Sequence, residues 1–143
     1  MALLCAPIGA SASANHRRGR SDGHIAVGLD VLALSAQNCR SATFDSEGKE
    51  MARVAETTAE TIATDNEGSY THVTLATLRA YEPLIAITPK EAQGGAYMIA
   101  ASGTTDSYSV TARAPDGNTF TIKRGSRGSI VRTARVCGHT QSW

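Results

Sequence analysis

The stretch that most constrains the fold is Glu47–Asn66, EGKEMARVAETTAETIATDN. Apolar and small residues recur in it at the 3.6-residue period of one helix face, namely Met51, Val54, Ala55, Thr58, Ala59 and Ile62. Because most of these residues are small, the layer that packs on them must come close. We therefore expect a long helix that lies directly against a second layer. Glu56 and Glu60 fall off the stripe, so we expect them on an exposed face, where they give solubility.

Both ends of this helix carry recognisable signals. Asp45 or Ser46 can cap the first amides, and Gly68 or Asn66 can adopt the left-handed conformation that ends a helix. A second, short helix is expected over Thr74–Tyr81, with Thr74 as its cap.

From Ala96 onwards the apolar period changes from 3.6 to 2, which indicates β-strands. Turn signals separate four expected strands, at Ala96–Ser102, Ser107–Ala114, Thr119–Arg124 and Ser129–Val136. Turns this short join neighbouring strands into an antiparallel meander. One face of it is apolar and the other carries Ser, Thr, Arg and Lys, as in a sheet covered on one side only. The expected fold class is α+β: a long N-terminal helix packed on a four-stranded antiparallel meander sheet, with a short second helix.

Charge is distributed unevenly along the chain, although the net charge is only +1. Residues 44–91 are acidic and residues 92–143 are basic. An acidic helical half and a basic sheet half can associate head to tail through opposite patches. The alternative is that both are ordinary solvated faces.

The first 43 residues fit poorly with the rest of the chain, and we expect a poorly ordered or misassigned N-terminal segment at 1–43 and one globular domain at 44–143. Ala12-Ser13-Ala14 resembles a signal-peptidase site, but no positive charge precedes it, so we expect no export signal here. No run of about 20 apolar residues predicts a membrane span. Of the three cysteines, Cys39 and Cys137 can pair in an oxidising compartment with Cys5 left over, or all three are free.

Three segments carry a family resemblance. The helix and loop AETTAETIATDNEGSY (Ala55–Tyr70), the segment LATLRAYEP (Leu75–Pro83) and the hairpin DSYSVTARAPDGNTFTIKR (Asp106–Arg124) resemble the globular part of type IV pilins and type II secretion pseudopilins. The resemblance covers about two-thirds of the chain. It implies a pilin-like domain at 44–143 that acts without catalysis, as a bacterial structural subunit.

The chain departs from the pilin pattern at its start. The processing site and the apolar helix of about 20 residues that normally precede such a domain are absent from residues 1–43. A misassigned start, a degenerate paralogue and a soluble relative all fit this departure, and we favour the first. The resemblance implies a cell-surface or extracellular location if the natural start is upstream. The implied partners are like pilin or pseudopilin subunits and the secretion or pilus assembly machinery.

No catalytic, cofactor-binding or metal-binding residue is expected, and we predict no enzyme. His16, His24, His72 and His139 are scattered without a metal-binding motif. Gly125-Ser126-Arg127-Gly128 indicates a hairpin turn, because it lacks the Lys-Ser/Thr and the following helix of a phosphate loop. Some pseudopilins bind calcium in the sheet region, and Asp106, Asp116 and Asn118 are the oxygen ligands available here. They fall in two turns without EF-hand spacing, so calcium remains the alternative to no cofactor.

The rival interpretation is a soluble binding module that holds an anionic ligand such as DNA on its basic strands. Its candidate residues are Lys123, Arg124, Arg127, Arg132 and Arg135. Only Phe120 and Tyr108 are interleaved aromatics, which gives little support to base stacking. Nucleic acid is therefore the less favoured partner.

Overall fold

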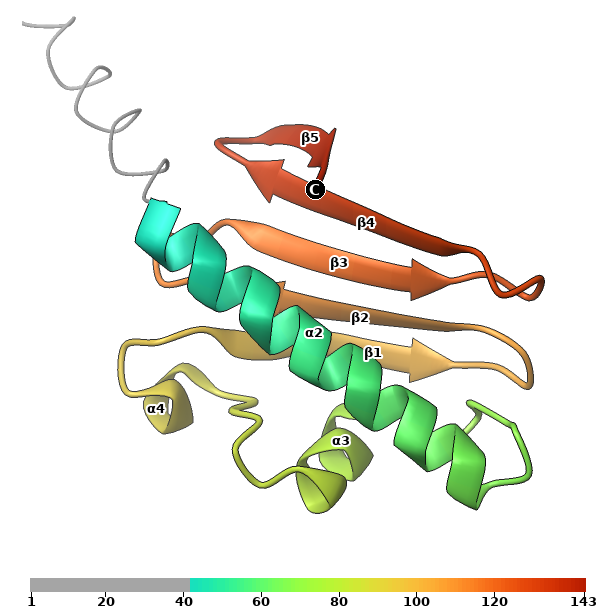
Figure 1. Cartoon of the computed structure of the whole chain (residues 1–143). Helices are drawn as coiled ribbons and strands as arrows, with labels where there is room; N and C mark the ends of the chain where they lie inside the picture. The colour runs from blue at the N-terminus through green and yellow to red at the C-terminus, as the bar shows by residue number, and fades with distance from the viewer. Residues whose placement is uncertain (1–41) are drawn as a thin grey trace, which may run out of the picture.

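The computed structural model describes residues 42–143, and expectations that concern residues 1–41 lie outside the described part. The chain is an α+β fold in which one long helix packs on one face of an antiparallel sheet (Figure 1). Its helices are α2 (Ala42–Asp65), α3 (Leu75–Tyr81) and α4 (Pro89–Ala92). Its strands are β1 (Tyr97–Gly103), β2 (Tyr108–Arg113), β3 (Thr119–Arg124), β4 (Ile130–Val136) and β5 (His139–Ser142). Figure 1 shows α2 running obliquely across the sheet, with α3 and α4 on the β1 side.

The sheet is a meander with strand order β1-β2-β3-β4-β5, and every neighbouring pair is antiparallel. The predicted four strands were therefore one too few. The missed strand, β5, follows a tight turn in which Cys137 and Gly138 both have positive φ (52° and 83°), as in the type I′ turn of a two-residue hairpin. All four β5 residues are exposed, so no apolar alternation marks them in the sequence.

The start of α2 differs from the prediction. The described helix already runs from Ala42, so Asp45 and Ser46 lie inside it and do not cap it. The Ser46 hydroxyl donates to the Ala42 carbonyl one turn earlier (2.9 Å). The end of α2 at Asp65 agrees with the prediction, because Gly68 is left-handed (φ 85°) and its N–H donates to the Ala63 carbonyl.

The connection between α2 and the sheet contains two short helices, of which only α3 was predicted. The Thr74 hydroxyl caps α3 by accepting from the Thr77 N–H (3.1 Å). No helix was predicted for the segment that forms α4. Its Thr88 hydroxyl caps the Glu91 N–H (3.2 Å) and Pro89 takes the first helical position, which are both ordinary helix-start signals.

The core lies between α2 and the sheet, and its close approach depends on small residues. The buried residues of α2 are Gly48, Ala52, Ala55, Thr58, Ala59, Ile62 and Ala63. Ala52 and Ala63 extend the predicted stripe, whereas Met51 and Val54 lie on its margin. Gly48 packs so tightly that a Cβ placed there would lie 2.4 Å from Cδ2 of the buried Phe120 ring. The glycine that weakens the helix in isolation is thus what lets the helix meet β3.

Candidate functional site

Two acidic residues of α2, Glu56 and Glu60, are turned towards the sheet. Glu56 receives Nη2 of Arg132 from β4 on both carboxylate oxygens, at 2.9 and 3.0 Å. The Glu56 side chain is only 18% exposed. The prediction that Glu56 lies on an exposed solubilising face was therefore wrong, because that helix face lies over the inward-pointing arginines of the last strands.

Glu60, one turn further along α2, sits in a polar cluster at the edge of the core. Its carboxylate accepts hydrogen bonds from the hydroxyls of Tyr70 (2.6 Å) and Tyr108 (3.2 Å) and forms an ion pair with Arg124 (3.3 Å). Burial, followed by the Glu60 carboxylate, raises the pKa of both tyrosines above the usual value of 10. Glu60 therefore links α2 to β2 and β3 as well as to the loop that carries Tyr70.

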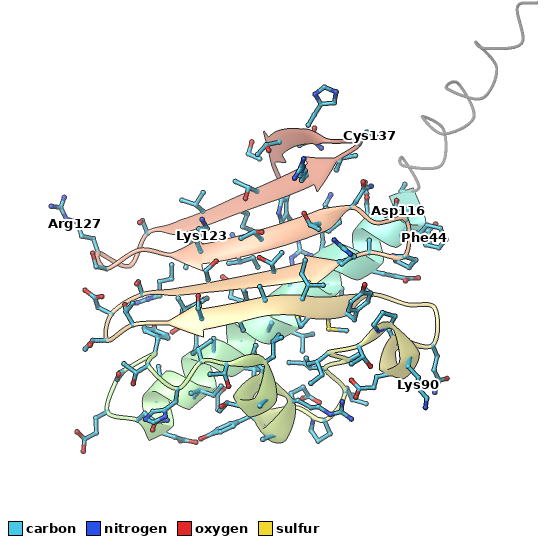
Figure 2. All side chains as sticks on the ribbon, turned by 180° about the vertical axis from the view of Figure 1, so that it is seen from behind. Phe44, Lys90, Asp116, Lys123, Arg127 and Cys137 are labelled. Atoms are coloured by element: carbon cyan, nitrogen blue, oxygen red, sulfur yellow. The ribbon has the colours of Figure 1, made fainter. Side chains whose placement is uncertain are left out.

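These ion pairs divide the basic residues that the sequence groups together. Arg124 and Arg132 alternate inwards and bind the acids of α2, whereas Lys123, Arg127 and Arg135 are exposed. Figure 2 shows Lys123 on the side of the sheet away from α2 and Arg127 at the tip of the β3–β4 turn. The predicted set of five cations is therefore not one binding surface.

We call the side of the sheet away from α2 the open face. The strand register places mainly hydroxyl-bearing residues on it, and Thr111, Thr121 and Thr133 form a row across β2, β3 and β4. The hydroxyls of Thr111 and Thr121 are 2.9 Å apart. Arg113, Lys123 and Arg135 are the cations among the outward-pointing strand residues, and no acidic residue occupies an outward strand position in the described sheet. The open face is thus polar and positively charged.

A broad depression of about 910 Å³ lies where the β1–β2 and β3–β4 turns meet this sheet. Ser102, Ser109 and Lys123 form part of its lining, together with Ser126 and Ser129 from the β3–β4 turn. Asp106 also lines it. The hydroxyls and the Lys123 ammonium group of this lining can bind a polar or anionic group.

A second groove, of about 530 Å³, lies between α2 and the segment that leads through α4 to β1. Met51, Val54, Leu84 and several alanines give it an apolar lining. Its rim carries four carboxylates, from Glu47, Glu50, Glu82 and Glu91, and we refer to it as the acidic groove. Leu84, on the lining of this groove, is 85% exposed.

The carboxylates of the groove differ in how far they are already engaged. Glu91 forms an ion pair with Arg79 and accepts from the Ile87 N–H (2.9 Å). These two contacts, with the backbone bond the larger, lower the pKa of Glu91. Glu50 approaches only Arg53, at 3.9 Å and largely in solvent. The α2 side of the rim therefore has the least compensated negative charge.

The three calcium candidates do not converge. Asp106 lies in the β1–β2 turn, whereas Asp116 and Asn118 lie in the β2–β3 turn at the other end of β2, roughly 20 Å away for a six-residue strand. Asn118 is buried and its amide nitrogen donates to the carboxylates of Asp45 (2.9 Å) and Asp116 (3.0 Å). Its amide oxygen accepts from the Cys137 N–H (3.2 Å). Asn118 therefore joins α2 to two turns of the sheet.

The other chemistry-bearing residues are dispersed. His72 and His139 are exposed and far apart in the fold, while His16 and His24 lie outside the described residues. Within residues 42–143, no three His, Cys, Asp or Glu side chains are placed to share a metal ion. Gly125–Gly128 forms the β3–β4 turn, as predicted, with Gly128 left-handed (φ 79°). Cys137 is disulfide-bonded, so the alternative of three free cysteines is wrong, while Cys39, its partner in the other alternative, lies outside the described part.

No protein-family model, curated protein or solved structure matches this chain. In the part of the chain that the structure describes, no helix has the length and apolarity to cross a bilayer.

Proposed function

We propose that the protein is a non-enzymatic, pilin-like structural subunit of a bacterial surface filament or secretion pseudopilus, and that it acts by self-association. The observation that carries the proposal is the one-sided packing of the sheet. A single long helix occupies the inner face with all of its small-residue stripe, and the open face is left for other contacts. The first turn of α2 lies at the margin of the sheet in Figure 1.

The self-association cannot use the apolar stripe of α2, because the sheet already covers it. The outward residues of α2 are polar over most of its length and include Glu50, Arg53, Thr57 and Thr61. Contacts between globular domains therefore fall to the open face, the acidic groove and the exposed loops. The proposed partners are like subunits and an assembly platform, and the proposed location is the cell surface or outside the cell.

The test is the assembly state of the protein in the cells that produce it. Surface structures are sheared off and sedimented at high speed, and the pellet is probed by electron microscopy with a gold-labelled antibody against the chain. We expect the chain in the pellet, with label along filaments or at short stubs on the envelope. Recovery of all the protein as free monomer in the cytosolic fraction would rule the proposal out.

A second candidate is a module that binds an anionic polymer on the open face. It rests on the three outward cations Arg113, Lys123 and Arg135 and on the absence of acidic residues from the described outward strand positions. Phe120 and Tyr108 are buried in the core and cannot stack on bases, so backbone phosphate is the only recognisable target. Three phosphate contacts predict that log Kobs for duplex DNA falls with log salt with a slope of about −3. A slope near zero in a fluorescence-anisotropy titration would exclude this function.

A further inference from the structure

The chain carries two surfaces that complement each other. One is the acidic groove, with an apolar lining and Glu47 and Glu50 on the α2 side of its rim. The other is on the open face, where Val131 of β4 is 53% exposed and lies directly opposite Lys123 of β3. We call Lys123, Val131 and Arg135 the basic patch.

The basic patch carries positive charge, whereas the acidic groove carries negative charge. Lys123 and Val131 are a cross-strand pair, which places their Cβ atoms about 5 Å apart. Arg135 follows Val131 on the same face at a distance of about 13 Å along the strand. One apolar side chain beside a lysine, with an arginine further along the same strand, thus matches an apolar groove with carboxylates on its rim.

We propose that the acidic groove of one molecule binds the basic patch of a second copy. This inference rests on the proposed self-association and names the surfaces that perform it. Charge complementarity selects a second copy as the occupant, because the groove and the patch have opposite charge on the same chain. Leu84 then gains the apolar contact that it lacks in the isolated molecule.

The position of the two surfaces fixes the symmetry of the contact. The groove lies on the helix side, between α2 and α4, and the patch lies on the open face (Figures 1 and 2). When the groove of one copy holds the patch of the next, its own patch points away and stays free. Such a heterologous contact repeats from copy to copy, and it generates an open helical chain, or a ring where the rotation between copies closes.

The ion-pair network of the fold keeps the two surfaces distinct. Arg124 and Arg132 bind Glu60 and Glu56 within the molecule, so these four charges are already paired and add nothing to a contact with a neighbour. Lys123 and Arg135 are exposed and carry no ion pair within the described residues. Contact between copies therefore need not break internal contacts.

The experiment is a charge swap on the purified full chain. Glu50→Lys alters the groove and Lys123→Glu alters the patch. Both side chains are exposed, so we expect folding to be unchanged, and circular dichroism checks this. Self-association is measured by sedimentation velocity at low ionic strength, supported by amine–carboxyl crosslinking. Each variant alone should associate roughly tenfold more weakly than the wild type, because like charges replace unlike ones.

The decisive sample is the equimolar mixture of the two variants. The groove that carries Glu50→Lys then faces the patch that carries Lys123→Glu, and the two unaltered surfaces also match, so the mixture should regain wild-type association. Matched controls are Glu67→Lys just beyond the far end of α2 and Arg127→Glu at the β3–β4 tip, which change the charge equally but lie outside both surfaces. Both controls should associate like the wild type. Leu84→Ser should weaken association without any change of net charge.

Three results would overturn the inference: a wild-type chain that stays monomeric, single variants that associate like the wild type, or a mixture that fails to regain association. Each leaves the proposed function standing if the cellular pellet still contains labelled filaments, since other surfaces then make the contacts. Free monomer in the cells together with regained association in the mixture would have the opposite meaning. It would support the contact between the groove and the patch but rule out the proposed filament function.

Discussion

Gly48→Ala is a sharp test of the packing between α2 and β3, because two effects of opposite sign act at this position. Alanine is favoured over glycine inside a helix by about 1 kcal/mol. The new Cβ would, however, lie 2.4 and 2.7 Å from two carbons of the Phe120 ring and 3.1 Å from Cβ of Ala114. Favourable carbon–carbon separations are about 3.5–4.0 Å, so the ring must move by roughly 1 Å or more.

Phe120 is completely buried and cannot turn aside into solvent. Overpacking of this kind costs about 1–3 kcal/mol, and contacts on two ring atoms put Gly48→Ala near the upper end. After subtraction of the helix-propensity gain, we expect a net loss of about 2 kcal/mol in the free energy of unfolding. With a urea m-value of about 1–3 kcal/mol/M, the midpoint should fall by roughly 1 M.

The assay is urea unfolding followed by fluorescence of Trp143, the single tryptophan, which packs edge-on against Phe120 with ring centroids 5.8 Å apart. Ser46→Ala, at an exposed position in the same part of α2, is the control and should shift the midpoint little. Phe120→Leu in the Gly48→Ala background should recover part of the loss by making room. A Gly48→Ala chain that is more stable than the wild type would refute the close packing.

Three further perturbations test the polar contacts. A double-mutant cycle of Glu56→Gln and Arg132→Gln should give a coupling energy of about 1–2 kcal/mol by urea unfolding, because the pair is half-buried, whereas a value near zero would mean an ordinary surface pair. Asn118→Ala should cost about 1–3 kcal/mol in the same assay, since it strips partners from two carboxylates and an N–H, and an unchanged midpoint would contradict that role. The raised pKa values of Tyr70 and Tyr108 predict that the contribution of these two groups to stability is constant below about pH 10 and falls above it, because the unfolded chain ionises first, by up to about 1.4 kcal/mol per pH unit for each tyrosine. Absorbance at the phenolate band should show these two tyrosines titrating only with unfolding, and their ionisation in the folded protein would count against the contacts with Glu60.

The apolar pattern of the sequence predicted the strands of this fold well where only one side of the strand is buried. Strand β3 has the predicted bounds, β4 differs by one residue at its start, and β1 and β2 differ by one residue at each end, because their alternating apolar residues face one covered side. Strand β5 is different, since all of its residues are exposed and it is recognised only by its pairing with β4. Apolar periodicity in the sequence cannot predict a strand that buries no residue in the core.

The surfaces were harder to predict than the elements. Glu56 and Glu60 lie off the apolar stripe, and nothing local shows that arginines 64 and 76 residues away face them. The acidic groove combines α2 with the segment before β1, so no contiguous motif describes it. One available signal was the Thr-Pro-Lys-Glu cap at residues 88–91, which would have placed Glu91 on a helix beside the groove. The alternation within β3 and β4 also assigns Arg124 and Arg132 to the inner face and Lys123 and Arg135 to the open face.

We propose that this domain is a pilin-like subunit, and the most direct test of this proposal is the start of the native protein. The measurement is mass spectrometry of its N-terminus in the cells that produce it, together with the upstream DNA sequence in all frames. The account predicts an apolar segment of about 20 residues joined to the start of α2 near Phe44. A native N-terminus at Met1, with no such segment encoded upstream, would contradict the filament function and leave the anion-binding module as the better explanation of the open face.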